Sequence, residues 1–460
     1  MVNISDNILV AQGTSIEDVF RHLNENKKGI VFVVDEVRRA LGCVTDGDIR
    51  RQLLVHSDLS VAVSTFMNRD FVRVTTVTPR EHILKLLDNG IHIVPMLDEG
   101  GRIVQLCSRD DFRLEGETSV FVRSRAPARI SFGGGGSDLT HYFLDQGGMV
   151  ISATIAKYAH ASLRQRSDNT VLIRSHDLNC VVEAANVGAL MLDGQLDLIK
   201  SIIQLIRPDF GFELDVSADF PVGSGLGGSA SIAVAIIGCF NGFRTHAWTR
   251  HQIAEMAFQA ERLILNIPGG WQDQYAAAFG GFNYMEFSAD ENLIIPLRLE
   301  SQTLRELEAC FLLCHTGRSH DSGAIHSDQK ARTKNSADVQ TAIRRQKEMT
   351  VEMKKRLLRG DVYGYGRMLH EAWLYKRQMS SLISDDSLDR VYQAAIEAGA
   401  LGGKILGAGG GGYFLFFTPP FERHNVSAAL EKLGYTNERV LFDSDGLTSW
   451  KMREPERIAR

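Results

Sequence analysis

The stretch PVGSGLGGSAS at residues 221–231 decides how the rest of the sequence is interpreted, because it leads directly into the apolar segment 232–240. Turn-prone residues crowd its first half, and no helix breaker follows until Gly238, so the pattern predicts a tight loop feeding a buried helix. Glycines let a backbone approach phosphate closely, and the unpaired N–H groups of a first helical turn point at it. The stretch matches neither GxxxxGK[ST] nor GxGxxG. A loop without a ligand is the alternative.

Composition narrows the class of protein. A chain of 460 residues predicts two or three domains, and 44% hydrophobic with 23% charged residues is ordinary for a globular protein. The net charge of -5 and the lack of a Lys/Arg-rich block argue against nucleic-acid binding. Six cysteines without a CxxC pair predict buried thiols in a reducing compartment. No leader-like start and no apolar run of about 18 residues occur, so we expect a cytoplasmic protein without a membrane partner.

Residues 1–116 contain one pattern twice. A helical segment (15–20, then 79–84) precedes an apolar strand (29–34, then 91–96) in each half. Each half then has a hydroxyl and a carboxylate three residues apart, Thr45 with Asp48 and Ser108 with Asp111. The pattern resembles a tandem pair of CBS domains, at about 1–60 and 61–116.

The CBS resemblance implies an adenine nucleotide site. In that family the hydroxyl contacts phosphate and the carboxylate holds ribose hydroxyls. The resemblance therefore assigns the phosphate contact to Thr45 and Ser108, and the ribose contact to Asp48 and Asp111. The same residues at a strand end are also common helix N-caps, which need no ligand. With either interpretation we expect a regulatory or dimerising module, and therefore a homodimer, because nothing in it can perform chemistry.

Two further glycine clusters follow a break in the apolar pattern at 114–119, where we place the domain boundary. The first is RAPARISFGGGGSD at 125–138, and the second is KILGAGGGGYFLFF at 404–417. Such runs let the main chain touch a ligand or another backbone, although the first could also be a flexible hairpin. Three glycine-rich turns, each beside a regular element, are hard to explain as unrelated loops.

In their order and spacing, the three clusters resemble the motifs of the GHMP kinases. The resemblance covers residues 121–460 and implies an α+β fold: a tandem CBS module (1–116) followed by a two-lobed kinase (117–460), with lobes at about 117–300 and 301–460. The motif at 129–138 is closest to the branch of D-glycero-D-manno-heptose 7-phosphate kinases, which also includes fucokinase-like enzymes. Ser137 and Ala156 depart from that branch, which usually has Thr and Asp there.

The resemblance also implies roles for individual residues. Asp273 would be the general base, and Arg129 or Lys157 would counter the charge on the transferred group. Ser229 and Glu261 would hold Mg²⁺, a cation that prefers one or two carboxylate oxygens. Residues expected to bind ATP are Pro221, Gly223, Ser224, Gly225, Leu226, Gly227, Gly228, Ser229, Ala230, Gly409 and Gly410. Residues expected to bind the sugar or its phosphate are Gly134, Gly135, Ser137, Asp138, Arg318, Lys376 and Arg377, with Arg174 and His176 as further candidates for the phosphate.

Plainer interpretations exist for several of these residues. Asp273 after a Pro-Gly-Gly turn could cap a helix, Glu261 beside Arg262 could be a surface charge, and any of the basic residues could lie on the surface. The sequence therefore predicts an ATP- and Mg²⁺-dependent kinase acting on the anomeric hydroxyl of a heptose 7-phosphate. The alternatives are a kinase of an unphosphorylated sugar such as L-fucose, and a nucleotide sensor without catalysis.

Overall fold

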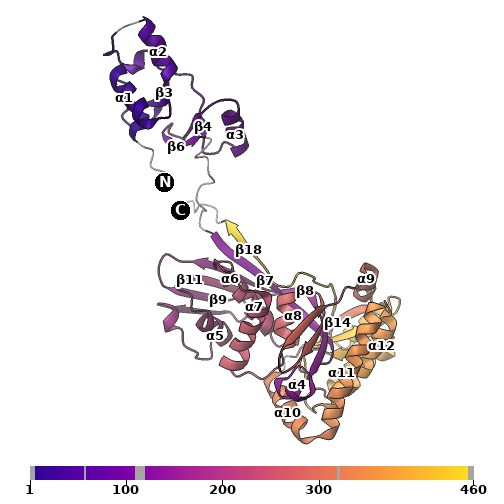
Figure 1. Cartoon of the computed structure of the whole chain (residues 1–460). Helices are drawn as coiled ribbons and strands as arrows, with labels where there is room; N and C mark the ends of the chain where they lie inside the picture. Colours follow the sequence, from indigo (N-terminus) through magenta and orange to yellow (C-terminus); the bar gives the residue numbers. More distant parts are fainter. Residues whose placement is uncertain (1–5, 56–57, 109–119, 319–321, 454–460) are drawn as a thin grey trace. The chain divides into compact units, whose positions relative to one another are not determined.

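The computed structural model describes residues 6–55, 58–108, 120–318 and 322–453 (Figure 1). The chain divides into two compact units, Met1–Gly116 and Glu117–Arg460. Among the described residues, no helix is long and apolar enough to cross a bilayer.

The first unit repeats one small sheet. In each half the first pair of strands is parallel and the second pair is antiparallel, which confirms the internal repeat. The first half comprises β1 (Leu9–Ala11), α1 (Ile16–Asn26), β2 (Ile30–Val34), β3 (Ala40–Thr45) and α2 (Asp46–Val55), and the second half β4 (Val74–Thr75), α3 (Arg80–Asp88), β5 (Ile93–Leu97) and β6 (Ile103–Ser108).

Local sequence explains where α1 begins and which face it buries. The hydroxyl of Ser15 accepts a hydrogen bond from the N–H of Asp18 at 3.2 Å, which caps the helix. Ile16, Val19 and Leu23 recur at helical spacing and are buried. The helix therefore packs one apolar stripe against the sheet of its half.

The second unit begins with an eight-stranded sheet. Its order is β10-β9-β11-β8-β12-β13, and β7 pairs with both β8 and β18. The strands are β7 (Val120–Gly133), β8 (Gly148–Gln165), β9 (Val171–Ser175), β10 (Cys180–Ala184), β11 (Phe212–Ala218), β12 (Phe282–Phe287), β13 (Asn292–Pro296) and β18 (Thr448–Arg453). The helices of this lobe are α4 (Thr140–Gln146), α5 (Asp197–Ile206), α6 (Gly228–Asn241), α7 (Arg250–Phe258) and α8 (Gln272–Phe279).

Helix α6 is the buried helix predicted after the glycine-rich loop. Every residue from Ala233 to Phe240 is buried, and the helix packs against β7, β8, α5, α7 and α8. A helix that is apolar all round needs such a position, because no face of it suits water. The start of α6, and the loop before it, are thereby held by the core.

The other lobe is a four-stranded antiparallel sheet with helices. The sheet order is β15-β16-β14-β17. Apolar residues that recur at helical spacing along its long helices are buried, namely Ile343, Met349, Met353, Leu357, Met368, Leu369 and Trp373. The elements are α9 (Ser301–Cys310), β14 (Phe311–His315), α10 (Ser322–Asn335), α11 (Ala337–Leu358), α12 (Val362–Gln378), α13 (Asp386–Glu397), β15 (Gly402–Ile405), β16 (Tyr413–Phe417), α14 (Arg423–Lys432) and β17 (Thr436–Arg439).

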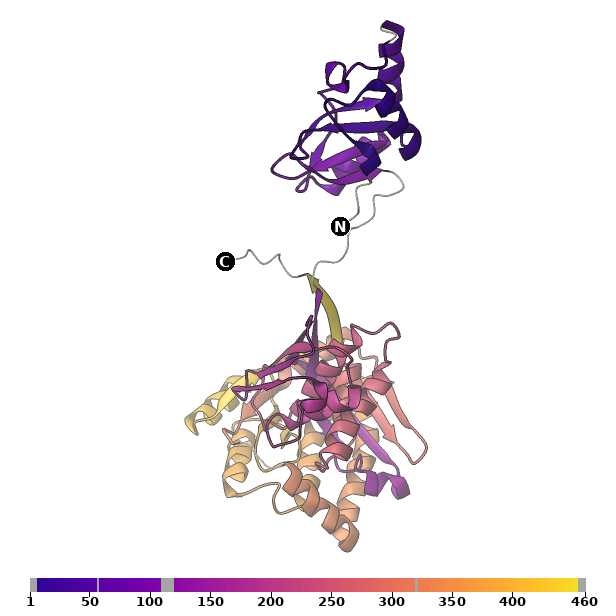
Figure 2. The same cartoon turned by 90° about the vertical axis from the view of Figure 1, so that its left-hand side faces the viewer.

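The lobes are not consecutive along the chain, because β18 returns from the second lobe to pair with β7 in the first sheet. Within the kinase unit, the free ends of β7 and β18 lie opposite the orange helices of the second lobe (Figure 2). The whole arrangement is a mixed α+β fold, which confirms the predicted fold class.

Candidate functional site

The loop before α6 presents backbone N–H groups to a cavity. Gly223, Gly225 and Gly227 have φ values of 71°, 77° and 75°, a conformation that side chains with a Cβ disfavour. The first-turn N–H groups of α6, from Gly228 to Ala230, have no preceding helical carbonyl to bond. A helix start of this kind suits an anion, because its N–H donors and the positive end of the helix dipole face the same space.

The glycine turn between β15 and β16 abuts this loop, backbone against backbone. A Cβ on Gly225 would lie 2.7 Å from the carbonyl oxygen of Leu406, and a Cβ on Gly407 would lie 2.6 Å from the Cα of Gly225. Gly407 and Ala408 line the cavity. Gly409 and Gly410, the two predicted from this cluster, instead contact Ile383, to which the N–H of Gly410 donates at 2.8 Å.

In the glycine cluster after β7, some glycines allow close backbone packing and others line the cavity. A Cβ on Gly134 would lie 1.8 Å from the carbonyl oxygen of Met149, so this glycine permits two backbones to touch. The hydroxyl of Ser137 donates to the carbonyl of Gly134 at 2.7 Å and accepts from the N–H of Met149 at 3.0 Å, which locks the turn. Only Gly135, Gly136 and Asp138 of this turn line the cavity.

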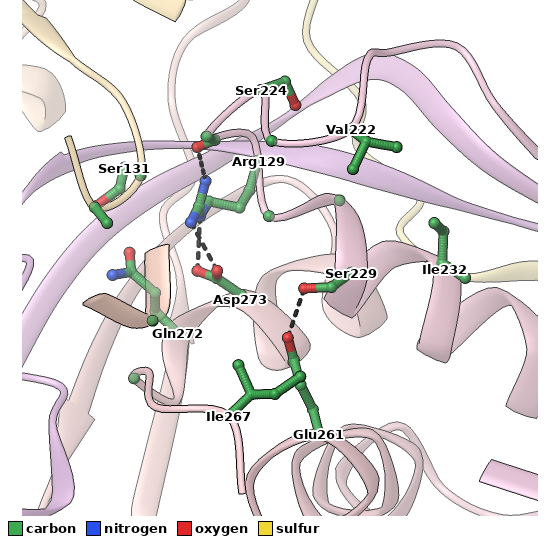
Figure 3. A pocket seen from close by; sticks show the side chains of 18 of the residues that line it. Arg129, Ser131, Val222, Ser224, Ser229, Ile232, Glu261, Ile267, Gln272 and Asp273 are labelled. Atoms are coloured by element: carbon green, nitrogen blue, oxygen red, sulfur yellow. Dashed lines mark hydrogen bonds and ion pairs between the residues drawn. The ribbon is translucent and has the colours of Figure 1, made fainter. Parts of the chain in front are cut away.

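The cavity has a volume of about 460 Å³, and an ion pair stands in its wall (Figure 3). The guanidinium of Arg129 donates to both carboxylate oxygens of Asp273 at 2.7 Å each, and to the carbonyl of Gly225 at 2.6 Å. Arg129 comes from β7 and is 4% exposed, while Asp273 is the second residue of α8. Two parallel N–H···O bonds hold both groups in one orientation. The helix-cap alternative for Asp273 does not hold, because no side chain caps α8.

A hydroxyl and a carboxylate meet on the other side of the loop (Figure 3). The Oγ of Ser229 donates to Glu261 at 2.6 Å, and the amide of Gln274 donates to the second oxygen of Glu261 at 2.8 Å. Glu261 lies in a π-helical turn, Gln259–Ile264, at the end of α7 and is 3% exposed, so it is not a surface charge. Mg²⁺ prefers oxygen ligands, and the hydroxyl of Ser229 lies beside the carboxylate of Glu261, so these two residues suit that ion.

A polar corner adjoins Asp273. Asp138 is buried and accepts from the backbone N–H groups of Gly136 and Gln272 and from the side-chain amide of Gln272, at 3.1, 3.3 and 3.1 Å. Burial raises the pKa of the Asp138 carboxyl, and the charge of Asp273 raises it further, against those N–H donors. The Oγ of Ser131 and the Oε1 of Gln272 are buried at the cavity without a protein partner. Such atoms suit the hydroxyl groups of a ligand.

Two lysines of the second lobe reach the same cavity. The Nζ of Lys376 donates to the carbonyls of Ile405 and Gly407 at 3.0 and 2.6 Å, and the Nζ of Lys404 donates to the carbonyl of Phe132 at 3.0 Å. Burial lowers the pKa of Lys404 to about 7, with a further contribution from Arg129. Lys376 has a pKa lowered in the same direction by burial, Lys404 and Arg129.

The far end of the cavity is apolar. Its walls come from β11, the glycine-rich loop, α5 and the start of α6, and in Figure 3 Val222 and Ile232 lie on the opposite side of Ser229 from Arg129. A flat aromatic ring suits such a place. The apolar residues lining it are Leu196, Leu198, Ile199, Val216, Ala218, Phe220, Val222 and Ile232.

Several residues singled out from the sequence are not among those lining the cavity. Lys157 pairs with Glu438 at 2.5 Å, Arg318 with Asp385 at 2.7 Å, and Arg377 with Asp389 at 2.5 Å. Arg174 pairs with Asp215 at 3.1 Å. Leu226 is fully buried, Ala230 is buried within α6, and His176 lies outside the lining although Ser175 and Asp177 belong to it.

In the first unit, Thr45 and Asp48 form hydrogen bonds with one another. Both the N–H and the hydroxyl of Thr45 donate to the carboxylate of Asp48, at 2.9 and 2.7 Å. The N–H of Asp48 donates back to the Thr45 hydroxyl at 3.4 Å, as in a helix cap at the start of α2. Ser108 ends β6, and Asp111 lies outside the described residues.

Sequence reasoning missed three cavity residues, Ser131, Gln272 and Lys404. All three lie inside the quoted glycine motifs or beside Asp273, which was the available signal. Their orientation toward the cavity depends on contacts with distant segments, as with Lys404 and Phe132.

Comparisons with known proteins find matches to both units of the chain. The family described as GHMP kinases N terminal domain matches residues 197–281, GHMP kinases C terminal matches 353–436, and CBS domain matches 2–55 and 63–115. The D-glycero-alpha-D-manno-heptose 7-phosphate kinase of Campylobacter jejuni is 36% identical over 338 residues, which cover 72% of this chain and 99% of the relative. The L-fucokinase/L-fucose-1-P guanylyltransferase of Bacteroides fragilis is 26% identical over 332 residues, covering 65% of this chain and 35% of that protein.

Solved structures agree with the fold. A D-glycero-D-manno-heptose 1-phosphate kinase from Bacteroides thetaiotaomicron has a TM-score of 0.61 at 30% identity, covering 72% of this chain and 100% of that one. A putative sugar kinase from Campylobacter jejuni has a TM-score of 0.60 at 33% identity, covering 72% of this chain and 98% of that one.

Proposed function

The chain belongs to the GHMP kinases, as an ATP-dependent sugar kinase with CBS domains at its N-terminus, and from that premise we propose that it phosphorylates the anomeric hydroxyl of D-glycero-D-manno-heptose 7-phosphate. The product would be the 1,7-bisphosphate. The observation that carries the proposal is the Arg129–Asp273 ion pair, placed between an anion-binding loop and a polar corner. The relative from Campylobacter jejuni, 36% identical, supports the choice of sugar.

The proposed reaction uses this geometry directly. The hydroxyl of the sugar would lie at Asp273, whose carboxylate takes its proton as the new O–P bond forms. The bond between the γ-phosphorus and the bridging oxygen breaks, and ADP leaves with that electron pair. Arg129 orients Asp273 and stabilises negative charge on the transferred group. An anomeric hydroxyl is more acidic than an ordinary alcohol, so Asp273 needs no unusual basicity.

ATP and Mg²⁺ would occupy the other half of the cavity. The loop 223–229 would bind the phosphates through its N–H groups, and the apolar end would hold the adenine ring. Ser229 and Glu261 would hold Mg²⁺, which would supply positive charge to neutralise the phosphates. The acceptor would be oriented by Asp138, Gln272 and Ser131.

The experiment is an assay of the purified chain with labelled ATP and a panel of acceptors. The panel contains heptose 7-phosphate, heptose 1-phosphate, unphosphorylated heptose and L-fucose, because the relatives' names differ in the sugar and in the position of its phosphate. We expect the highest kcat/KM with heptose 7-phosphate and a product phosphorylated at the anomeric carbon. If the chain phosphorylates L-fucose and none of the heptoses, the proposed acceptor is wrong and the alternative of a fucokinase-like enzyme holds.

The CBS module would bind an adenine nucleotide that tunes the kinase. Its support is the Thr45–Asp48 pair at the junction of β3 and α2, repeated in sequence as Ser108 and Asp111. Calorimetry on the full chain with AMP, which cannot donate a phosphoryl group, should give saturable heat that Asp48→Asn removes. Heat of the same size in Asp48→Asn would place the nucleotide elsewhere.

A cytoplasmic location completes the proposal. All six cysteines are free thiols in the structure, and five of them are buried, which suits a reducing compartment. Fractionation of the producing cells should recover the chain with the cytoplasmic enzymes.

A further inference from the structure

Three cationic side chains from distant segments converge on the cavity. Arg129 leaves β7, Lys376 lies near the end of α12, and Lys404 lies within β15, and all three line the same space. Lys404 is 3% exposed. The positive charges act on one another, since Arg129 and Lys404 both disfavour a proton on Lys376, and Arg129 does the same at Lys404.

Neither lysine forms an ion pair with a described carboxylate, although four carboxylates line other parts of the cavity. Asp273 already forms its two hydrogen bonds with Arg129. Throughout the part of the chain that the structure describes, neither lysine has a carboxylate within 4.0 Å of its ammonium, and the partners of both are backbone carbonyls. Carbonyl dipoles satisfy hydrogen bonds but carry no net negative charge.

Such an arrangement is costly unless a ligand supplies an anion. A buried charge without a counter-charge is strongly unfavourable, and proteins usually pair it or replace it by an apolar group. Burial accordingly lowers the pKa of Lys404 to about 7 and lowers that of Lys376 as well. A dianion entering the cavity would reverse both effects, because an opposite charge favours the protonated form.

The neighbours of the lysines indicate which kind of anion. The carbonyl of Gly407 accepts from Lys376, the turn at Gly407 touches Gly225, and the carbonyl of Gly225 accepts from Arg129. The ammonium of Lys376 is thus connected, through Gly407 and Gly225, to the glycine-rich loop and to Arg129, while Lys404 lines the same cavity from β15. A phosphoryl group has the charge and the oxygen atoms that such donors bind.

We propose that Lys376 and Lys404, together with Arg129, form a site for a phosphoryl dianion on the second-lobe wall of the cavity. The dianion is the group in transfer from ATP or the phosphate that the acceptor already carries. The inference rests on the proposed phosphoryl transfer but not on the identity of the sugar. Neither lysine replaces Asp273, because both act by neutralising negative charge.

The first test measures phosphate binding without sugar or ATP. Inorganic phosphate should raise the Tm of the full chain, and Lys404→Met and Lys376→Met should each lose most of that rise. Without phosphate, both variants should melt at or above the wild-type temperature, because each removes a cation that has no ion-pair partner, at a buried position for Lys404 and a half-buried one for Lys376. A merely structural lysine would give the opposite result, a lower Tm in the variant.

The matched control is Lys347→Met. Lys347 also donates to a backbone carbonyl, that of Gln146 at 2.5 Å, and burial also lowers its pKa, but it does not line the cavity. This variant should keep the full rise in Tm with phosphate. An unchanged rise in the Lys404 and Lys376 variants as well would overturn the proposal.

The second test separates the two sources of the phosphoryl group. If the lysines bind the group in transfer, the Met variants lose about 10²-fold or more in kcat with every acceptor and in the slow hydrolysis of ATP without sugar. If they bind the acceptor's own phosphate, KM rises for heptose 7-phosphate alone and ATP hydrolysis is unchanged. Unaltered kcat and KM in all assays would refute the site.

These results also distinguish the two proposals of function. If the wild-type chain does not phosphorylate heptose 7-phosphate, but phosphate raises its Tm and each lysine variant loses that rise, the proposed acceptor is wrong and the anion site stands. If the wild type and both lysine variants phosphorylate heptose 7-phosphate with the same kinetics, the proposed acceptor stands and the anion site is wrong.

Discussion

At the scale of single residues, the site depends on pairs that are far apart in the chain. Arg129 and Asp273 are 144 residues apart, and two hydrogen bonds of 2.7 Å fix the carboxylate where an acceptor hydroxyl would lie. Ser229 and Glu261 are similarly matched at 2.6 Å. The orientation of each carboxylate therefore depends on specific partners, Arg129 for Asp273 and both Ser229 and Gln274 for Glu261, so a single substitution can disorient it.

The first prediction concerns Asp273→Asn. The amide cannot accept the proton of the sugar hydroxyl, so kcat should fall by about 10²- to 10⁴-fold while the KM for ATP changes little. Steady-state kinetics measure both parameters, and Asp290→Asn, at an exposed turn, is the control. A variant that retains wild-type kcat would exclude Asp273 as the base and revive the alternative of a nucleotide sensor.

The second prediction concerns pH and Lys404. Its pKa is about 7 in the folded chain, against an ordinary value of 10.5 that the unfolded chain keeps. Between these values the unfolded state binds more protons than the folded state, so the free energy of unfolding rises with pH. Below pH 7 Lys404 is protonated in both states, and its buried charge then destabilises the folded chain most. Lys404→Met should therefore exceed the wild type in stability most at pH 6, and the excess should shrink by pH 9. The groups facing Lys404 in this titration are Arg129 and Lys376.

Denaturant unfolding of the phosphate-free chain at pH 6, 7.5 and 9 tests this window. Equal stability differences between the variant and the wild type at all three pH values would show that Lys404 keeps its ordinary pKa.

At the scale of elements, the glycine turns act as a pair. The loop before α6 and the turn before β16 approach so closely that a Cβ on Gly412 would lie 2.4 Å from the carbonyl oxygen of Ser224. The N–H of Tyr413 donates to that same carbonyl at 3.1 Å. The second lobe thus supports the glycine-rich loop of the first, and the two motifs depend on one another.

Gly225→Ala should disturb this contact. Its φ of +77° and the carbonyl of Leu406 at 2.7 Å from an added Cβ leave no room, so the loop must shift. We expect the KM for ATP to rise at least about 10-fold and the stability to fall by about 1–2 kcal/mol, the usual cost of a left-handed side chain.

The matched control is Gly434→Ala. This glycine also has a positive φ, +87°, but an added Cβ would meet nothing within 4 Å. It should lose a similar amount of stability without a change in the KM for ATP. Equal effects of the two substitutions on that KM would show that backbone strain, and not the clash between loops, is responsible.

At the scale of the whole molecule, a kinase unit is combined with a CBS module, and the module has apolar side chains at its surface. Leu54 and Val55 at the end of α2 are 88% and 72% exposed. Exposed apolar groups of this kind often mark contacts between chains. They support the prediction that the module forms a homodimer.

Light scattering of the full chain tests the oligomeric state. We expect twice the chain mass of 51.0 kDa, and Leu54→Asp should shift the population toward the single chain because it places a charge in the proposed contact. Lys451→Asp, at an exposed position of β18 in the other unit, is the control. A wild-type chain that stays at 51.0 kDa at all concentrations would contradict the dimer.

The sequence by itself determined the fold class, the CBS repeat and the three glycine motifs of the kinase. Such features are local: a left-handed turn needs glycine at that position, a buried helix needs an uninterrupted apolar run, and a repeat shows in the order of residues. These requirements are independent of distant parts of the chain, so they can be recognised without a structure.

Only the tertiary structure decided which charged side chains share the cavity. Lys157, expected beside the transferred group, pairs with Glu438 instead, whereas Lys404 enters the cavity from a β-strand. The sequence also did not predict β18, which returns to pair with β7. Where a charge lies depends on which distant backbone or carboxylate reaches it, and those partners are set by the packing of whole lobes, which no local pattern records.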